Sequence, residues 1–290
     1  MSESMLGRTC LITGATFGIG KATALGIARR GARVVIVGRE AERTQATAVW
    51  LRRESGNPAV EYLIADLFSL AEVRRLAQAF ATQQERLDVL VNNAGGFFSE
   101  RATTADGFER TWALNHLAYF RLTLDLLPLL KASAPARIVN VASNVHARGR
   151  VDFDDLGGAR RYDGVRAYCQ SKLANVLFTY ALARRLADTG VTANCLHPGM
   201  VATGISRNMR GIPWLFMNAM GAFILTPEQG AATSIHVASS PDAEGVSGKY
   251  FVKRTPARSC RLSYDEALQE RLWATSLEQT GLEAATPKPA

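Results

Sequence analysis

Short runs of apolar, often β-branched residues alternate with longer segments of helical periodicity through most of the chain. Such continuous apolar runs are typical of strands that are covered on both faces, as in a parallel sheet between two layers of helices. The sequence therefore predicts an α/β fold with a doubly wound parallel sheet of about seven strands. We expect these strands at Thr9 to Thr13, Arg33 to Val37, Val60 to Ala65, Asp88 to Asn92, Arg137 to Ala142, Val191 to Leu196 and near Lys249 to Val252.

Helices are predicted between these strands and at the end of the chain. Apolar residues recur at helical spacing over about 18–30, 40–54, 69–84, 107–131 and 167–188. Ser263, followed three residues later by Glu266, indicates the N-cap of a C-terminal helix over about 264–280 that ends before Gly281. With no visible linker or repeat, we expect a single Rossmann-type domain over residues 1–290 with helices on both faces of the sheet.

Composition excludes several other classes of protein. Hydrophobic residues make up 47% of the chain, which is enough for a large core. The four cysteines, Cys10, Cys169, Cys195 and Cys260, lack the paired spacing of a disulfide framework or a zinc ribbon, and we interpret them as reduced thiols. No apolar stretch reaches the roughly 18 residues that cross a bilayer, and Met1 to Arg8 has no signal pattern. We therefore expect a cytoplasmic protein without a transmembrane segment.

The charged residues indicate neither a nucleic-acid surface nor a metal site. The net charge is +8, but the basic residues are scattered in pairs along helical segments, which is typical of solvated faces. The positive charge can still attract an anionic cofactor. His116, His146, His197 and His236 lack the spacing of metal ligands, so we interpret them as structural or solvated and expect no metal.

A glycine-rich turn follows the first predicted strand and leads directly into a helix. Its glycines allow a tight turn and a close approach to a pyrophosphate, whose charge meets the N–H groups at the start of the helix. The alternative is a plain connecting turn. The residues that we expect to bind a dinucleotide here are Gly14, Thr16, Phe17, Gly18, Ile19 and Gly20.

Arg39 stands at the end of the second predicted strand, where an NAD-binding protein would carry an acidic residue for the adenosine ribose. A guanidinium at this position can bind a 2′-phosphate through two hydrogen bonds, and no carboxylate repels it. We therefore expect NADP(H) rather than NAD(H). The alternative is that Arg39 is a solvated residue at the start of the next helix, where Glu40 follows it.

Tyr168 and Lys172 lie four residues apart at the start of a predicted helix, which places their side chains on one face. A nearby cation favours a phenolate, so Lys172 is expected to lower the pKa of Tyr168 toward neutral pH. This pairing suits proton transfer to or from an alcohol or ketone oxygen. The spacing alone is common, and Cys169 between them is interpreted as a packed thiol.

Ser143 follows the strand at Arg137 to Ala142, Asn93-Ala94-Gly95 follows Asp88 to Asn92, and Asn115 lies within the helix predicted before Ser143. Together with the glycine-rich turn and Tyr168 to Lys172, this ordered set resembles the short-chain dehydrogenase/reductase family from Arg8 to Gly281.

The resemblance implies a role for each matched position. Tyr168 would exchange the proton, Lys172 would lower its pKa and hold the nicotinamide ribose, and Ser143 would bind the substrate carbonyl. Asn115 would support a chain of waters that relays the proton outward. The further residues implied to bind the cofactor are Asp66 and Leu67 at the adenine, Asn92, Ala94 and Gly95 along the dinucleotide, and Pro198, Gly199, Val201 and Thr203 at the nicotinamide end.

Within the family the chain is similar to the retinol-dehydrogenase-like branch. The separation of 25 residues between Ser143 and Tyr168 suits that branch. The similar stretches are Leu114 to Leu117, Ser171 to Phe178, Leu196 to Gly199, Gly248 to Phe251, and Leu272-Trp273 to Gly281.

Two long segments, 146–166 and about 200–227, follow strand ends and are expected to shape the substrate site. The second is rich in apolar residues and is interpreted as a lid over a hydrophobic pocket, or alternatively as a patch for a partner or for peripheral membrane contact. Phe97 and Phe98 are either substrate walls or core.

The sequence thus predicts an NADP(H)-dependent oxidoreductase that interconverts a hydrophobic alcohol and its aldehyde or ketone. The alternatives are a nonenzymatic NADP-binding regulator and a reductase of the same fold that acts on a carbon-carbon double bond. By analogy with relatives, a homo-oligomer through the helices at 107–131 and 167–188 remains open.

Overall fold

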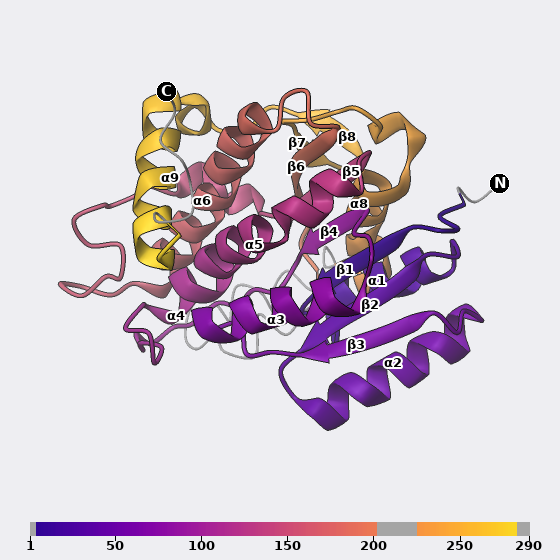
Figure 1. The fold of residues 1–290 in the computed structure, drawn as a ribbon. Helices are drawn as coiled ribbons and strands as arrows, with labels where there is room; N and C mark the ends of the chain where they lie inside the picture. The colour runs from indigo at the N-terminus through magenta and orange to yellow at the C-terminus, as the bar shows by residue number, and fades with distance from the viewer. Residues whose placement is uncertain (1–3, 202–224, 283–290) are drawn as a thin grey trace.

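A computed structural model describes residues 4–201 and 225–282 of the chain (Figure 1). Within these residues eight strands form one sheet in the order β3-β2-β1-β4-β5-β6-β7-β8, and every neighbouring pair is parallel except β7 and β8. The strands are β1 (Thr9–Thr13), β2 (Arg33–Gly38), β3 (Val60–Ile64), β4 (Val89–Asn92), β5 (Ala136–Val141), β6 (Val191–His197), β7 (Tyr250–Val252) and β8 (Thr255–Ala257).

Helices cover both faces of the sheet, so the predicted fold class is confirmed. Residues of α1, α2 and α8 pack against one face, and residues of α3, α5 and α6 pack against the other, with α9 outside α5 and α6 (Figure 1). The helices are α1 (Gly18–Ala28), α2 (Ala41–Ser55), α3 (Leu70–Gln83), α4 (Arg110–Trp112), α5 (Ala118–Ala132), α6 (Gly164–Arg185), α8 (Pro227–Ser239) and α9 (Glu266–Thr280).

The strand order reverses between β1 and β4, and this reversal positions the candidate site. Chain leaving β1 turns toward β2, whereas chain leaving β4 turns toward β5, so the two connections diverge at the carboxyl edge of the sheet. Ligands of open α/β sheets bind in the crevice that such a divergence leaves. The glycine-rich turn and the turn after β4 both lie at this crevice.

β8 and α8 are absent from the sequence-based prediction. β8 is a short, exposed edge strand that pairs antiparallel with β7 and contains Pro256, so it has neither apolar alternation nor length. α8 begins with a capping box in which Thr226 accepts from the Gln229 N–H and the Gln229 side chain accepts from the Thr226 N–H. That signal was present in the sequence and was overlooked.

The helix predicted over 107–131 is interrupted. Glu109 caps α4, and a five-residue π-helical turn, η1 (Ala113–Leu117), joins α4 to α5. The helix predicted over 167–188 begins earlier, at Gly164, because Asp163 accepts the Val165 and Arg166 N–H groups.

The predicted N-cap of the C-terminal helix is wrong by two residues. Ser263 lies in a 3₁₀ turn, η6 (Arg261–Tyr264), where its hydroxyl donates to Cys260 O, and Asp265 caps α9 instead. Gly281 ends the helix in the left-handed conformation, as expected. Trp273 of α9 packs against Phe120 and Phe178, so the surface of α5 and α6 that α9 covers is not free for association.

No helix within residues 4–201 and 225–282 is long and apolar enough to span a bilayer.

Candidate active site

The turn between β1 and α1 is packed too tightly for side chains at its glycines. Gly14 and Gly18 have φ values of +63° and +54°, which disfavour other residues. A Cβ on Gly14 would lie 2.7 Å from Ala94 Cα, and one on Gly20 would lie 2.4 Å from Gly14 O. The backbone at the start of α1 is therefore left bare, and no acidic residue lies in the first helical turn. This bare, positive helix end fits the pyrophosphate of a dinucleotide.

The turn after β4 is held directly against the glycine-rich turn. Thr13 Oγ1 accepts the N–H groups of Asn93 (2.9 Å) and Ala94 (3.1 Å). In return Asn93 Nδ2 donates to Thr13 O at 2.8 Å. Reciprocal hydrogen bonds thus join the two turns into one unit at the point where the strand order reverses.

Arg39 is exposed at the end of β2, beside this unit. A Cβ on the preceding Gly38 would lie 2.5 Å from the Thr16 side chain, so the end of β2 packs directly on the glycine-rich turn. The Arg39 guanidinium carbon lies 5.8 Å from the centre of the Phe68 ring. Asp66, after β3, accepts the Phe68 N–H at 3.1 Å, and Leu67 is buried. The residues expected at an adenosine phosphate and an adenine thus share one corner of the site.

Asn115 ties the turn after β4 to the start of α6. Its Nδ2 donates to Gly96 O and to Ser171 Oγ, both at 3.0 Å, and its Oδ1 accepts the Gly96 N–H at 2.8 Å. Ser171 Oγ in turn donates to Tyr168 O at 2.8 Å. Asn115 lies inside the π-helical turn η1, a feature that is frequent at functional sites and that sequence periodicity does not reveal.

Lys172 is buried beside Tyr168. Its Nζ donates to Val141 O at 3.0 Å and lies 5.6 Å from the centre of the Tyr168 ring. Gly95 faces the same space, since a Cβ there would lie 3.5 Å from Lys172 Nζ. Phe97 meets the Tyr168 ring edge to face, with centres 5.9 Å apart. Tyr168, Lys172 and the exposed Gly95 backbone therefore meet at one place.

The pKa values of this pair differ from the expectation. Burial lowers the pKa of Lys172 to about 7, and burial, with a smaller effect of Cys169, raises the pKa of Tyr168 well above its ordinary value. The expected lowering of the Tyr168 pKa by Lys172 is therefore wrong for this arrangement. Desolvation of the phenolate dominates, because an ammonium with a pKa near 7 is only partly charged and is directed at Val141 O.

Ser143 follows β5 in extended conformation and begins a 3₁₀ turn, η2 (Asn144–Arg148). Its hydroxyl donates to Asn144 Oδ1 at 3.3 Å and accepts the Val145 N–H at 3.4 Å. Both bonds are long, so the hydroxyl can be redirected toward a substrate at little cost. The Lys172 bond to Val141 holds α6 against this same end of β5.

The Asn92 side chain is directed away from the sheet edge. Its Nδ2 donates to Thr123 Oγ1 and to Asn140 Oδ1, both at 2.9 Å, and Asn140 Nδ2 continues to Thr179 Oγ1 at 3.0 Å. This buried network joins β4, β5, α5 and α6. We expected Asn92 to line the cofactor, but its side chain is part of the core.

The segment after β6 reaches the start of α1. Val201 packs with Ile19 and Ala231 and pairs with Leu225 across an isolated bridge, and Gly199 has a φ of +92°. Pro198 and Gly199 are partly buried next to it. Thr203 and most of the predicted substrate loop at 200–227 lie outside the described residues.

The histidines are mostly packed side chains. His116 Nε2 lies 2.8 Å from Ser276 Oγ, and burial lowers the pKa of His116 to about 3. Burial, with a contribution from His146, lowers the pKa of His197 to about 4. Among the described residues no group of three His, Cys, Asp or Glu side chains could hold a metal ion. His146 is different because it contacts Ser143, a contact that the sequence interpretation missed.

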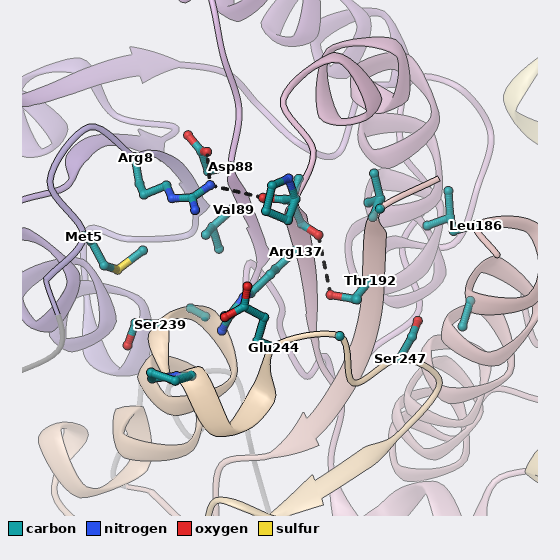
Figure 2. A pocket seen from close by; sticks show the side chains of 18 of the residues that line it. Met5, Arg8, Asp88, Val89, Arg137, Leu186, Thr192, Ser239, Glu244 and Ser247 are labelled. Atoms are coloured by element: carbon teal, nitrogen blue, oxygen red, sulfur yellow. Dashed lines mark hydrogen bonds and ion pairs between the residues drawn. The ribbon is translucent and has the colours of Figure 1, made fainter. Parts of the chain in front are cut away.

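A cavity of about 670 Å³ lies at the opposite, amino-terminal edge of the sheet (Figure 2). Arg8 in its wall bonds Asp88 Oδ1 at 2.9 Å and Pro135 O at 3.3 Å, and Thr192 donates to Ala136 O at 3.5 Å. Arg137 donates to Ser240 O at 2.8 Å. These polar groups are bonded to neighbouring protein groups, and the residues that line the cavity include none of those assigned to the reaction.

The sequence of this chain is similar to those of known dehydrogenases. The family model described as short chain dehydrogenase matches residues 8–211. Human retinol dehydrogenase 14 is 45% identical over 96% of this chain and 88% of its own length, and human retinol dehydrogenase 13 is 42% identical over 96% and 86%.

Solved structures show the same likeness. An uncharacterized protein from Mycobacterium paratuberculosis has a TM-score of 0.79 at 33% identity, covering 99% of this chain and 97% of its own. Pseudomonas aeruginosa RhlG, solved as an NADP active-site complex, has a TM-score of 0.70 at 31% identity, covering 86% and 95%.

Proposed function

The chain belongs to the short-chain dehydrogenase family, in its retinol-dehydrogenase-like branch, and on this premise we propose that it is an NADP(H)-dependent oxidoreductase that interconverts a hydrophobic alcohol and its aldehyde or ketone. One observation carries the proposal. Lys172 Nζ bonds the end of β5 two residues before Ser143 and lies beside the Tyr168 ring and the exposed Gly95 backbone. A proton donor, a titratable amine and a serine hydroxyl therefore border the crevice where a dinucleotide fits.

Tyr168 is the proton donor to the carbonyl oxygen in the reductive direction. Burial keeps its phenol protonated at neutral pH, which suits an acid. The Ser143 hydroxyl turns from its two long bonds to donate a hydrogen bond to the same oxygen. A bound nicotinamide supplies or accepts the hydride.

Lys172 and Asn115 maintain the proton donor. With its pKa near 7, the Lys172 amine can release and regain a proton at neutral pH, which allows it to return a proton toward Tyr168 and to bind ribose hydroxyls. Asn115 holds the Gly96 backbone and, through Ser171, the second turn of α6 in register. Its position also suits the support of a water chain, as the family resemblance implies.

The residues of this chain fit NADP(H) along the whole crevice. The turn from Gly14 to Gly20 would hold the pyrophosphate, and Arg39 would bind the 2′-phosphate, since no carboxylate occupies its position. Asp66 and Leu67 would border the adenine. The nicotinamide end would be held by Gly95, Pro198, Gly199, Val201 and Thr203. The NADP complex of the similar RhlG protein supports this assignment.

The substrate is proposed to be bulky and apolar. Phe97 is buried against the Tyr168 ring and gives the reaction centre an apolar wall. The names of the retinol dehydrogenase relatives also point to a hydrophobic alcohol. The segment at 200–227, rich in apolar residues, remains our candidate for a lid.

A panel of apolar aldehydes and ketones tests the activity by NADPH oxidation with identification of the product. We expect the corresponding alcohol. A saturated carbonyl from an unsaturated substrate would instead indicate reduction of a carbon-carbon double bond. Tight NADPH binding without turnover of any compound would indicate a regulator.

Parallel titrations with NADPH and NADH test the cofactor. Arg39→Ala should lower the affinity for NADPH about tenfold or more and leave the affinity for NADH nearly unchanged. The reason is that a charge-assisted bond to phosphate contributes roughly 1.5–3 kcal/mol. Arg53→Ala, an exposed arginine on α2 paired with Glu54, is the matched control and should change neither affinity. A preference for NADH in the unmodified protein would overturn the NADP(H) assignment.

A further inference from the structure

His146 lies in η2, three residues after Ser143, and its side chain is almost completely buried. Nδ1 of its ring lies 2.6 Å from Ser143 O, and Nε2 lies 3.1 Å from Cys260 N. The ring therefore bridges the end of β5 and the segment that precedes η6, 114 residues later in the chain.

This geometry determines the protonation state of the ring. The Cys260 amide can only donate, so Nε2 must accept and cannot carry a proton. Ser143 O can only accept, so Nδ1 must carry the proton and donate. His146 is therefore the neutral Nδ1–H tautomer. The groups that face it are Tyr250 of β7, whose ring centre lies 4.8 Å away, and His197 of β6, which is itself held neutral by burial.

The bridge continues to the helix that carries the proton donor. Ser259, next to Cys260, shares a hydrogen bond of 2.7 Å with Tyr180 OH of α6. Tyr180 lies on the same helix, about three turns after Tyr168 and about two turns after Lys172. A closed path of contacts thus runs from Ser143 through His146, Cys260 and Ser259 back to α6.

The Ser143 backbone is held by this path more firmly than its hydroxyl is. Ser143 O accepts both the His146 ring N–H and, at 3.2 Å, the His146 backbone N–H. The two bonds of the hydroxyl are 3.3 Å and 3.4 Å long. The position of the hydroxyl therefore depends on the backbone, and the backbone depends on His146.

We infer that His146 is a positioning residue of the reaction, which sets the Ser143 hydroxyl relative to the Tyr168 phenol by bridging Ser143 O and the Cys260 N–H. The inference rests on the proposed function for the role of Ser143. The bridge itself rests only on the geometry of the ring and its two partners.

The first experiment removes each half of the bridge separately. His146→Phe removes both bonds, and His146→Asn retains an N–H donor close to the Nδ1 position. Cys260→Pro removes the amide donor together with the thiol, which donates to His146 O at 3.9 Å, and the Cys260 φ of −68° suits proline. Cys260→Ala, which removes the thiol contact alone and keeps the amide, is its matched comparison, and His236→Asn is the control for histidine loss.

We expect His146→Phe and Cys260→Pro to lower kcat by about 10- to 100-fold, because small displacements of catalytic groups are this costly. KM and NADPH affinity should change little, since Ser143 acts mainly on the developing charge. His146→Asn should recover part of kcat. Equal kcat in His146→Phe and the unmodified enzyme would overturn the inference. A raised KM with unchanged kcat would also overturn it.

The second experiment does not need a substrate. In ¹⁵N NMR spectra of the imidazole, we expect a protonated Nδ1 and an unprotonated Nε2 at neutral pH. Exchange of the Cys260 amide hydrogen should be faster in His146→Phe than in His236→Asn. A protonated Nε2, or equal exchange rates, would overturn the bridge even if no substrate were found.

Ser143→Ala distinguishes a failure of the proposed role of Ser143 from a failure of the positioning role of His146. If Ser143→Ala retains full activity, the proposed role of Ser143 fails while the tautomer measurement still decides the bridge. If Ser143→Ala is inactive but His146→Phe is fully active, the positioning role alone fails.

Discussion

The two edges of the sheet bury charged groups in opposite ways. At the amino-terminal edge, the Asp88 side chain is only 2% exposed and is paired with Arg8, Arg86 and the Thr9 N–H. At the carboxyl edge, the buried Lys172 ammonium bonds a single backbone carbonyl. Burial alone would raise the pKa of Asp88, but its partners hold it below the ordinary value, whereas no charged partner among the described residues offsets burial at Lys172.

Under the proposed function, this difference separates groups that stabilise the fold from groups that perform chemistry. A buried charge with several partners favours one ionisation state and one conformation. A buried amine without a counter-charge keeps a pKa near neutrality, at a cost in stability, and such shifted values gather at functional sites. The carboxyl edge should therefore respond to mutation mainly in activity, and the amino edge mainly in stability.

The largest expected effect is at Tyr168. Tyr168→Phe should lower turnover by about 10³-fold or more, because it removes the proton donor from a partly buried site. NADPH binding and the free energy of unfolding should change little. Tyr62→Phe, on β3 away from the site, should leave turnover unchanged. Steady-state kinetics with a hydrophobic aldehyde measure the turnover of both variants. An active Tyr168→Phe enzyme would contradict the proposed difference between the two edges of the sheet.

Asp88 gives the largest expected effect on stability. Asp88→Ala leaves the buried Thr9 N–H without a partner and should lower the free energy of unfolding by about 3 kcal/mol, with turnover retained by the folded enzyme. The lowered pKa means that the contribution of Asp88 is present above its ordinary pKa of about 3.9 and is lost as the pH falls through the folded value. In urea unfolding, the difference in free energy between the unmodified protein and Asp88→Ala should be smaller at pH 3 than at pH 7.

Lys172→Met should act in the opposite direction on stability. Removing an amine whose pKa is lowered to about 7 should raise the free energy of unfolding at pH 7 by about 2 kcal/mol and should abolish most activity. Between pH 7 and about 10 the unfolded chain binds the proton more strongly, so the unmodified protein gains stability relative to the variant as the pH rises. A variant that is less stable at pH 7 would contradict this account.

Arg137 gives the smallest expected effect. Its guanidinium donates to Val237 O and Ser240 O at the end of α8, on the amino-terminal side of the sheet. Arg137→Met should lower the free energy of unfolding by about 1 kcal/mol through loss of these bonds, without a change in kcat. A change in kcat with no change in thermal midpoint would mean that the two edges are coupled.

Local patterns were sufficient for most of the fold. The parallel strands could be predicted because burial on both faces makes each a continuous apolar run. β8 could not be predicted, since its pairing with β7 depends on a turn at Lys253 and Arg254 with positive φ values rather than on apolar residues. The early start of α6 and the cap of α9 depended on a choice between neighbouring capping residues, which packing decided.

The candidate site was predicted less evenly. The glycines between Gly14 and Gly20 act through their own backbone, so their pattern was informative without a structure. Asn92 ends its strand at the carboxyl edge, where the resemblance implies a cofactor contact, yet its side chain turns inward to Asn140, and only the pleat of the strand decides that. His146 carried no signal, because its partner Cys260 lies on a distant segment.

The order of strands and helices, the tight glycine-rich turn and the spacing of Tyr168 and Lys172 were all determined by residues near one another in the chain. The protonation states were decided by the tertiary structure: a protonated phenol, an amine with a pKa near 7 and a single tautomer of His146. The physical reason is that ionisation depends on desolvation and on hydrogen-bond partners, and folding supplies both from segments far apart in the sequence.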